Sequence, residues 1–253
     1  MTDRTRVVRS RQLLLLVRPT ARTIRWAALL GGAVAAQFVL WAANGELSRG
    51  GPVSLLPIRV AAVLLCLGAV FVLDDDAGAT VEPAVASLAV RRGIRLALTV
   101  PVAWAAWGAA LWTASRLAAS GRGTAAVVPR SLPVAGLMLE AAALLAVTLA
   151  AAAVATRSVG HGRGGVAGGP AVLGFVLAMV SIGRYWPLFP AANSEPAWVA
   201  AHVRWAVILA VASTVLVLFT LDPARRRWPG RRRRREERGL ARGPSRASVG
   251  GEH

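Results

Sequence analysis

Long apolar stretches alternate with short polar gaps along the chain. A helix that crosses the hydrocarbon core of a bilayer needs about 20 mostly apolar residues. Five stretches are close to that length, and another, at 171–182, is shorter and could continue to Pro187. The pattern predicts an all-α polytopic membrane protein with six transmembrane helices, at residues 24–43, 53–73, 94–114, 132–156, 171–182 and 203–221.

Two regions of this pattern contain residues that disturb an apolar helix. Pro57 and Arg59 fall in the first turns of the second stretch. The proline predicts a kink, and the arginine is expected to extend toward the outer lipid headgroups. Between the fourth and fifth stretches, glycines predict a flexible loop on the inner side, at positions 160, 162, 164, 165, 168 and 169.

The overall composition agrees with a chain that lies in a bilayer. Hydrophobic residues make up 55% of the sequence and the mean hydropathy is +0.53, both higher than in ordinary soluble domains. We expect one transmembrane domain at residues 24–222, with no room for a second folded domain. The single cysteine, Cys66, lies inside an apolar run, so we expect it to pack in the core rather than form a disulfide or bind a metal.

The distribution of arginine predicts the orientation of the helices. All 30 basic residues are arginines, and basic residues accumulate at the cytoplasmic ends of membrane helices. If the N-terminus is cytoplasmic, the inner side holds 23 arginines and the outer side seven. An even number of helices places both termini on the same side, so we expect both in the cytoplasm of a bacterial cell.

The two tails carry much of the net charge of +18. In the N-terminal tail, 1–23, residues 7–19 could form a basic helix in the membrane interface or remain disordered. The C-terminal tail, 223–253, is rich in arginine, proline and glycine and is predicted to be disordered and held by anionic lipids. Since the arginines flank apolar segments and the chain has no RNA-binding motif or zinc spacing, we expect no nucleic-acid partner.

An acidic cluster follows the second apolar stretch at its inner end. Adjacent carboxylates repel one another, so they need a cation, a basic partner or a helix N-terminus. The cluster could be a solvated loop that pairs with its own arginines, or a loop with a short helix at 81–90 that docks on a cytoplasmic subunit. The residues predicted to make that contact are Asp74, Asp75, Asp76, Glu82, Arg91 and Arg92.

The same aspartates could in principle hold magnesium for diphosphate chemistry, as in a membrane-embedded transferase. Magnesium sites use carboxylates that share one coordination shell. Adjacent aspartates point to different faces of a helix, the DxxxD spacing of membrane prenyltransferases is missing, and no later inner loop has a second acidic cluster. We therefore expect no catalytic site, metal or cofactor. Without lysine, the chain also cannot have a P-loop for ATP.

Polar residues inside the predicted helices are further candidates. An acid in a membrane helix costs a few kcal/mol unless it faces a cavity or a partner. Glu140 could contact a cationic substrate, bind a proton or make a structural hydrogen bond to Gln37 or Ser181. At the outer side, His202 is expected to be an interface residue rather than a ligand. The other members of this predicted outer belt are Arg184, Trp186, Trp198, Arg204 and Trp205.

With these features, the chain resembles the six-helix permeases of bacterial type-2 ATP-binding-cassette exporters, particularly the arginine- and alanine-rich ones of actinobacteria. The resemblance covers about residues 10–225. It rests on the helix count and on four short motifs: Phe71-Val72-Leu73-Asp74-Asp75, Val90-Arg91-Arg92-Gly93-Ile94-Arg95, Leu139-Glu140-Ala141-Ala142, and Arg204-Trp205-Ala206 leading to Asp222-Pro223-Ala224. One departure is the segment 187–201, which is short for the outer helical segment that such permeases often carry.

The resemblance implies a transmembrane permease subunit, driven by a separate ATP-binding subunit that contacts the loop 74–92. It also implies a second permease chain, identical or different, and leaves the substrate open. The alternative function is a non-transporting membrane scaffold or accessory subunit.

Overall fold

The computed structural model describes residues 17–43, 55–74, 88–120, 132–158, 164–183, 185–190 and 195–220. All of them belong to one compact unit, Met1–Leu221. The predictions for the C-terminal tail 223–253, and most of the predicted interfacial helix at 7–19, lie outside these residues.

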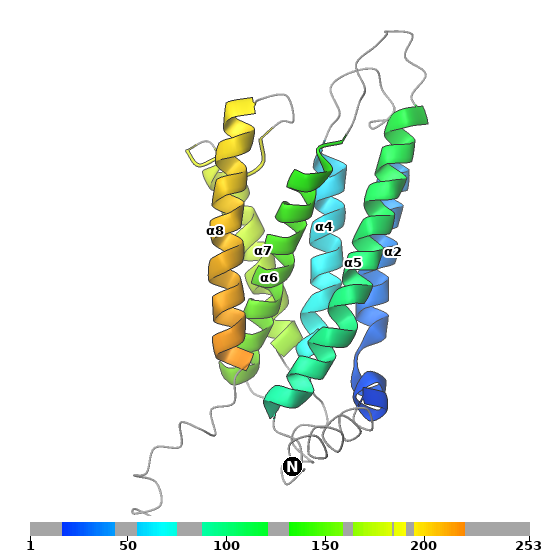
Figure 1. Ribbon diagram of the computed structural model, residues 1–253, viewed down its shortest axis with the longest axis vertical. Helices are drawn as coiled ribbons and strands as arrows, with labels where there is room; N and C mark the ends of the chain where they lie inside the picture. Colours follow the sequence, from blue (N-terminus) through cyan, green and yellow to red (C-terminus); the bar gives the residue numbers. More distant parts are fainter. Residues whose placement is uncertain are drawn as a thin grey trace, which may run out of the picture. The chain divides into compact units, whose positions relative to one another are not determined.

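The described part of the chain is helical and contains no strand. Successive helices run in opposite directions (Figure 1). They are α2 (Trp26–Ala42), α4 (Leu56–Ala69) with its continuation η1 (Val70–Leu73), α5 (Leu88–Ser120), α6 (Val134–Ser158), α7 (Gly164–Ile182) and α8 (Glu195–Thr220).

Five of these helices are long and apolar enough to cross a membrane. A sixth is added if α2 and the short helix Val17–Thr23, which meet at a bend of 62°, count as one span. The prediction of an all-α chain is therefore confirmed for the described residues, and five of their helices could cross a membrane. We refer below to the Asp74 end of the bundle, where α2, α5 and α7 begin, and to the Glu140 end, where α4, α6 and α8 begin.

The start of α7 differs from the prediction of a flexible glycine loop. The helix begins at Gly164, seven residues before the predicted start, and Gly164, Gly165 and Gly168 are buried in its first turns. A Cβ on Gly165 would lie 2.3 Å from the Phe71 ring, and one on Gly168 would lie 2.9 Å from the Val70 side chain. These glycines therefore allow α7 to approach η1, and close packing overrides their low helix propensity.

The starts of α4 and α8 also differ from the predicted ones. Pro57 occupies the first turn of α4 and begins the helix instead of kinking it, because a first-turn residue needs no N–H for the helix ladder. Helix α8 begins at Glu195, eight residues before the predicted start, so Trp198 and His202 are helical. Hydropathy alone missed these first eight residues of α8 because polar residues lie among them.

Helices α2 and α4 cross at a pair of glycines. A Cβ on Gly32 would lie 2.7 Å from the Leu64 carbonyl oxygen, and one on Gly68 would lie 2.6 Å from the Ala28 carbonyl oxygen. Both distances are too short for any side chain. The added Cβ would clash with backbone atoms of the other helix, which cannot move aside as a flexible side chain could. Small residues at a crossing let two helix backbones approach closely, which is the main source of helix association in lipid.

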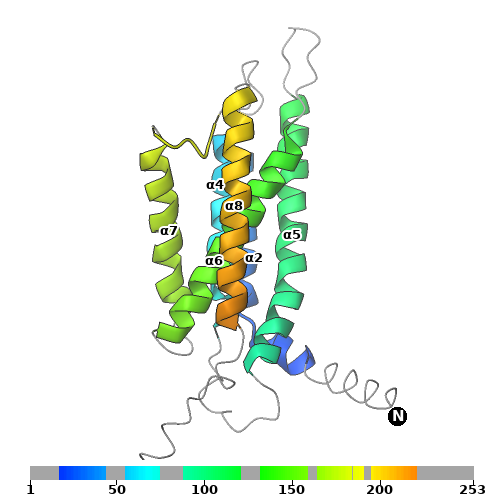
Figure 2. The ribbon, with the colours of Figure 1, turned by 60° about the vertical axis from the view of Figure 1, so that its left-hand side comes forward.

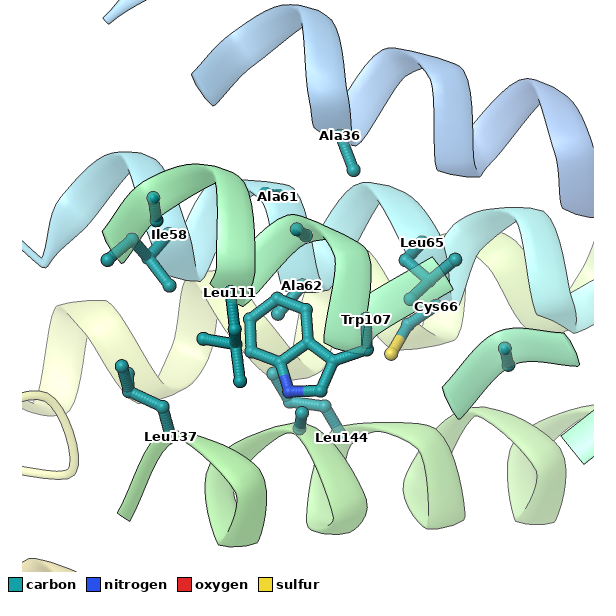
Figure 3. Close-up of a cluster of buried hydrophobic side chains, with 14 of the residues drawn as sticks. Ala36, Ile58, Ala61, Ala62, Leu65, Cys66, Trp107, Leu111, Leu137 and Leu144 are labelled. Carbon is teal, nitrogen blue, oxygen red and sulfur yellow. The ribbon is translucent and has the colours of Figure 1, made fainter. Parts of the chain in front are cut away.

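The main apolar core lies between α2, α4, α5 and α6. The Trp107 indole of α5 is 2% exposed and lies among side chains that include Ala62 of α4 and Leu144 of α6 (Figure 3). Cys66 is buried in the same cluster, as expected from its apolar surroundings.

Helices α7 and α8 contribute less to this core. The buried residues of α7 all lie in its first half, and Figure 2 shows α7 at one edge of the bundle. Along α8, side chains four residues apart form an apolar stripe that is 58–61% exposed, at Val199, Val203, Val207 and Val211. An apolar surface of this kind fits a lipid environment.

The glycine crossing gives a direct test of the helix packing. We expect Gly32→Leu to lower the stability of the bundle by about 1–3 kcal/mol, because the added side chain forces α2 away from α4. Gly31→Leu is the matched control, since a Cβ there meets no atom within 4 Å. Unfolding midpoints of the purified chains in detergent measure the difference, and equal midpoints would contradict the close crossing.

Candidate functional site

Glu140 and Arg59 form a buried ion pair near the Glu140 end of the bundle. Arg59 Nε donates to Glu140 Oε2 and Arg59 Nη2 donates to Oε1, both at 2.9 Å. The side chains are only 12% and 3% exposed. The two-point contact satisfies both carboxylate oxygens and joins α4 to α6.

This pair corrects two predictions. Arg59 does not extend to the lipid headgroups, because the buried carboxylate of Glu140 holds it inside the bundle. Glu140 pairs with Arg59 rather than with Gln37 or Ser181, and the Ser181 hydroxyl donates instead to the Leu177 carbonyl of its own helix, at 2.8 Å. A bidentate ionic partner satisfies a buried carboxylate better than a single neutral donor can.

The segment Tyr185–Pro190 covers the Arg59–Glu140 pair. Arg59 Nη2 also donates to the Pro190 carbonyl at 3.1 Å, and its guanidinium lies 5.2 Å from the centre of the Phe189 ring. The same segment is held from α8, where Trp205 Nε1 donates to the Leu188 carbonyl at 2.8 Å. The connection between α7 and α8 is thus bound to α4 and α8 together.

His202 lies beside the ion pair. Its Nε2 is 3.8 Å from Glu140 Oε1, and its ring centre is 4.3 Å from that of Trp198. The side chain is 14% exposed, so most of it is buried within the bundle. A Cβ on Gly136 would lie 2.4 Å from His202 Nε2, so the absence of a side chain on Gly136 makes room for the imidazole.

The residues of the predicted outer belt lie in different environments in the structure. Trp186 is 42% exposed, and the Arg204 guanidinium lies 5.7 Å from its ring while donating to the Pro187 carbonyl at 2.9 Å. Trp205 is fully buried, which corrects its assignment to the surface: its indole N–H reaches a backbone acceptor inside the bundle. Trp198 is half-buried on His202, and Arg184 lies outside the described residues.

A second polar cluster lies at the Asp74 end. Asp74 is 1% exposed, and its Oδ1 accepts a hydrogen bond of 2.8 Å from the Gly165 N–H in the first turn of α7. Arg25 Nη1 lies 4.0 Å from Oδ2. The carboxylate therefore has both kinds of partner that a buried acid needs, a helix N-terminus and a cation.

Two arginines of α5 extend this cluster across the bundle. Arg95 donates to the Asp74 carbonyl through Nη1 and to Thr23 Oγ1 at 3.0 Å through Nη2. Arg92 donates to the Phe219 carbonyl at the end of α8, at 3.0 Å, and to Thr156 Oγ1 of α6, at 3.1 Å. A cation at the C-terminal carbonyls of a helix is stabilised by the helix dipole.

The residues predicted to contact an ATP-binding subunit are therefore not equivalent. Asp74 and Arg92 are buried and bonded within the chain. Arg91 is half-buried beside them, and Asp75, Asp76 and Glu82 lie outside the described residues. The sequence did not indicate the roles of Arg25 and Gly165, which become apparent only when the ends of several helices meet. Arg95 lies near the aspartates in the sequence, but it donates to the Asp74 backbone carbonyl rather than to a carboxylate.

One signal in the sequence did point to the Arg59–Glu140 pair. Glu140 is the one acid within the six predicted membrane helices, and Arg59 lies at a similar depth from the same side. A buried acid in a membrane helix requires a partner of opposite charge or a polar cavity. Depth alone did not identify the partner, because several arginines lie near helix ends.

No protein-family model, curated protein or solved structure matches this chain. Within the described residues, no three His, Cys, Asp or Glu side chains are grouped so that they could hold a metal ion.

The ion pair predicts non-additive mutations. We expect Arg59→Leu or Glu140→Leu alone to lower stability by about 3–5 kcal/mol, because each leaves a buried charge without its partner. The double variant should lose much less than the sum of the two. A double-mutant cycle on unfolding free energies measures this coupling, and additive losses would show that the two side chains do not interact.

Proposed function

We propose that this chain is the membrane-spanning permease subunit of a bacterial ATP-binding-cassette exporter, with six spans and both termini in the cytoplasm. Helix α2 is then the first span, and helix Val17–Thr23 leads into it. The Asp74 end faces the cytoplasm and the Glu140 end faces outward. A separate ATP-binding subunit supplies the energy, since the chain has no lysine for a P-loop.

The observation that supports this proposal is the polar cluster around Asp74. It joins η1, α5, the start of α7 and the segment before α2 through Asp74, Arg95 and Gly165. These contacts flank the connection 75–87 between η1 and α5. A subunit that pulled on this connection would act on several helices at once.

The helices that meet at Asp74 also reach the opposite end of the bundle. Helix α4 carries Arg59 near its start and continues through η1 to Asp74. Helix α6 carries Glu140 near its start and Thr156, a partner of Arg92, near its end. A rigid tilt of these helices would therefore change both polar clusters, as alternating access to a transport path requires.

The remaining partners in this proposal are a second permease chain and anionic lipids. The exposed apolar faces of α7 and α8 are available for either lipid or a second chain. The alternative, a membrane scaffold or accessory subunit, needs no ATP-binding partner. Association with an ATPase is therefore the decisive test.

We expect the chain, solubilised from its native membrane in mild detergent, to co-purify with a protein that has Walker motifs. Arg91→Glu should weaken that association at least about tenfold, a loss of ~1.4 kcal/mol, because it reverses a charge beside the connection 75–87. Arg116→Glu is the matched control at the other end of α5, where Arg116 lies 5.2 Å from the Trp112 ring. Recovery of no ATPase would favour the scaffold.

The single cysteine allows a clean test of the proposed orientation. In a Cys66→Ala background, single cysteines at Ser10, Ser120 and Ser248 give one label site in each tail and one at the last residue of α5. We expect a membrane-impermeant maleimide to label Ser120→Cys in intact cells. Labelling of Ser10→Cys and Ser248→Cys should require permeabilised cells, and the reverse pattern would contradict the proposal.

A further inference from the structure

His202 has one ring nitrogen whose role is fixed by its neighbour. His202 Nδ1 lies 2.7 Å from the Trp198 carbonyl oxygen. A carbonyl oxygen only accepts hydrogen bonds, so Nδ1 must carry the proton of the neutral ring. The other nitrogen, Nε2, is then an unprotonated acceptor.

Nε2 is directed toward a second acceptor. It is buried and has no hydrogen-bond partner among the described residues, and the nearest charged oxygen is Glu140 Oε1 at 3.8 Å. Two facing acceptors with no hydrogen between them gain nothing from their approach. A proton on Nε2 would attract the carboxylate, and an approach of about 1 Å would turn this contact into a charge-assisted hydrogen bond.

The space around Nε2 is narrow, so only a very small ligand would fit there. A methyl group on Gly136 would lie only 2.4 Å from Nε2, and the Trp198 ring covers the imidazole. The charged groups that face this site are Glu140 from α6 and Arg59 from α4, while Arg204 of α8 is directed to the Pro187 carbonyl. The net charge of the Arg59–Glu140 pair is zero, so a proton would not meet a net positive charge.

From this geometry we infer that His202 Nε2 is a proton-binding site that uses Glu140 as its counter-ion. Binding adds one proton to the ring and breaks no bond. The protonated ring then competes with Arg59 for Oε1 and joins α8 directly to α6, which changes the contacts under the segment Tyr185–Pro190. The inference does not depend on transport; only the assignment of this site to the outer side of the membrane rests on the proposed function.

The first test observes the ring itself. The full-length chain with His161→Gln and His253→Gln, labelled with ¹⁵N-histidine and placed in lipid nanodiscs, gives a single imidazole signal set from His202. If the inference holds, the ring is the Nδ1–H tautomer at about pH 8 and carries a second proton on Nε2 at about pH 5. An Nε2–H tautomer at the higher pH, or a ring that stays neutral throughout, would overturn the inference.

The second test asks whether the proton can replace Arg59. Arg59→Gln removes the bidentate partner of Glu140, so the fraction of monodisperse protein should fall at about pH 8. If the proposed proton binds Nε2, that fraction should recover by at least half at about pH 5. The control is the double variant Arg59→Gln with His202→Gln, which should not recover. Recovery of the control, which would come from protonation of Glu140 itself, or failure of the single variant at both pH values, would overturn the inference.

Discussion

The cost of keeping an ionised carboxylate among apolar helices is the constraint on which the structure depends most. Glu140 lies inside α6, where water cannot solvate it, and its charge requires a cation with matched geometry. The planar guanidinium of Arg59 supplies two parallel hydrogen bonds and still reaches the Pro190 carbonyl. One pair therefore sets the position of α4 against α6 and of the segment that closes that end of the bundle.

The other end of the bundle satisfies its buried charges differently. Asp74 accepts from the first turn of α7, and Arg92 donates to the last turn of α8, so helix ends act as partners in addition to side chains. This arrangement gives hydrogen-bond partners to backbone groups at helix ends that have none within their own helices. It also makes the helix ends interdependent, so that displacement of one affects the others.

The two ends are linked by the helices that carry them. Glycines at the α2–α4 crossing and at the start of α7 bring the backbones close enough for these polar contacts to form. Close packing of this kind makes a bundle respond by discrete tilts rather than by gradual deformation. A proton on His202 and a force at the connection 75–87 would thus act on the same helices from opposite ends.

Hydropathy along the sequence was sufficient to predict an all-helical chain with apolar helices at nearly the right positions, because the energy of transfer into lipid is a local sum over residues. It misplaced the starts of α7 and α8, where buried glycines and polar residues lie within the helices. It assigned Trp205 to the surface because aromatic residues near helix ends commonly lie at the membrane interface.

The partner of each charge was decided only by the tertiary structure. Arg59 and Glu140 are 81 residues apart in the sequence, and Asp74 and Gly165 are 91 apart. The sequence determined that Glu140 needed a partner, since burial of a charge is costly wherever the helix lies. Which arginine, which helix end and which histidine would meet these carboxylates depended on how the helices cross, and the crossings are set by contacts between distant small residues.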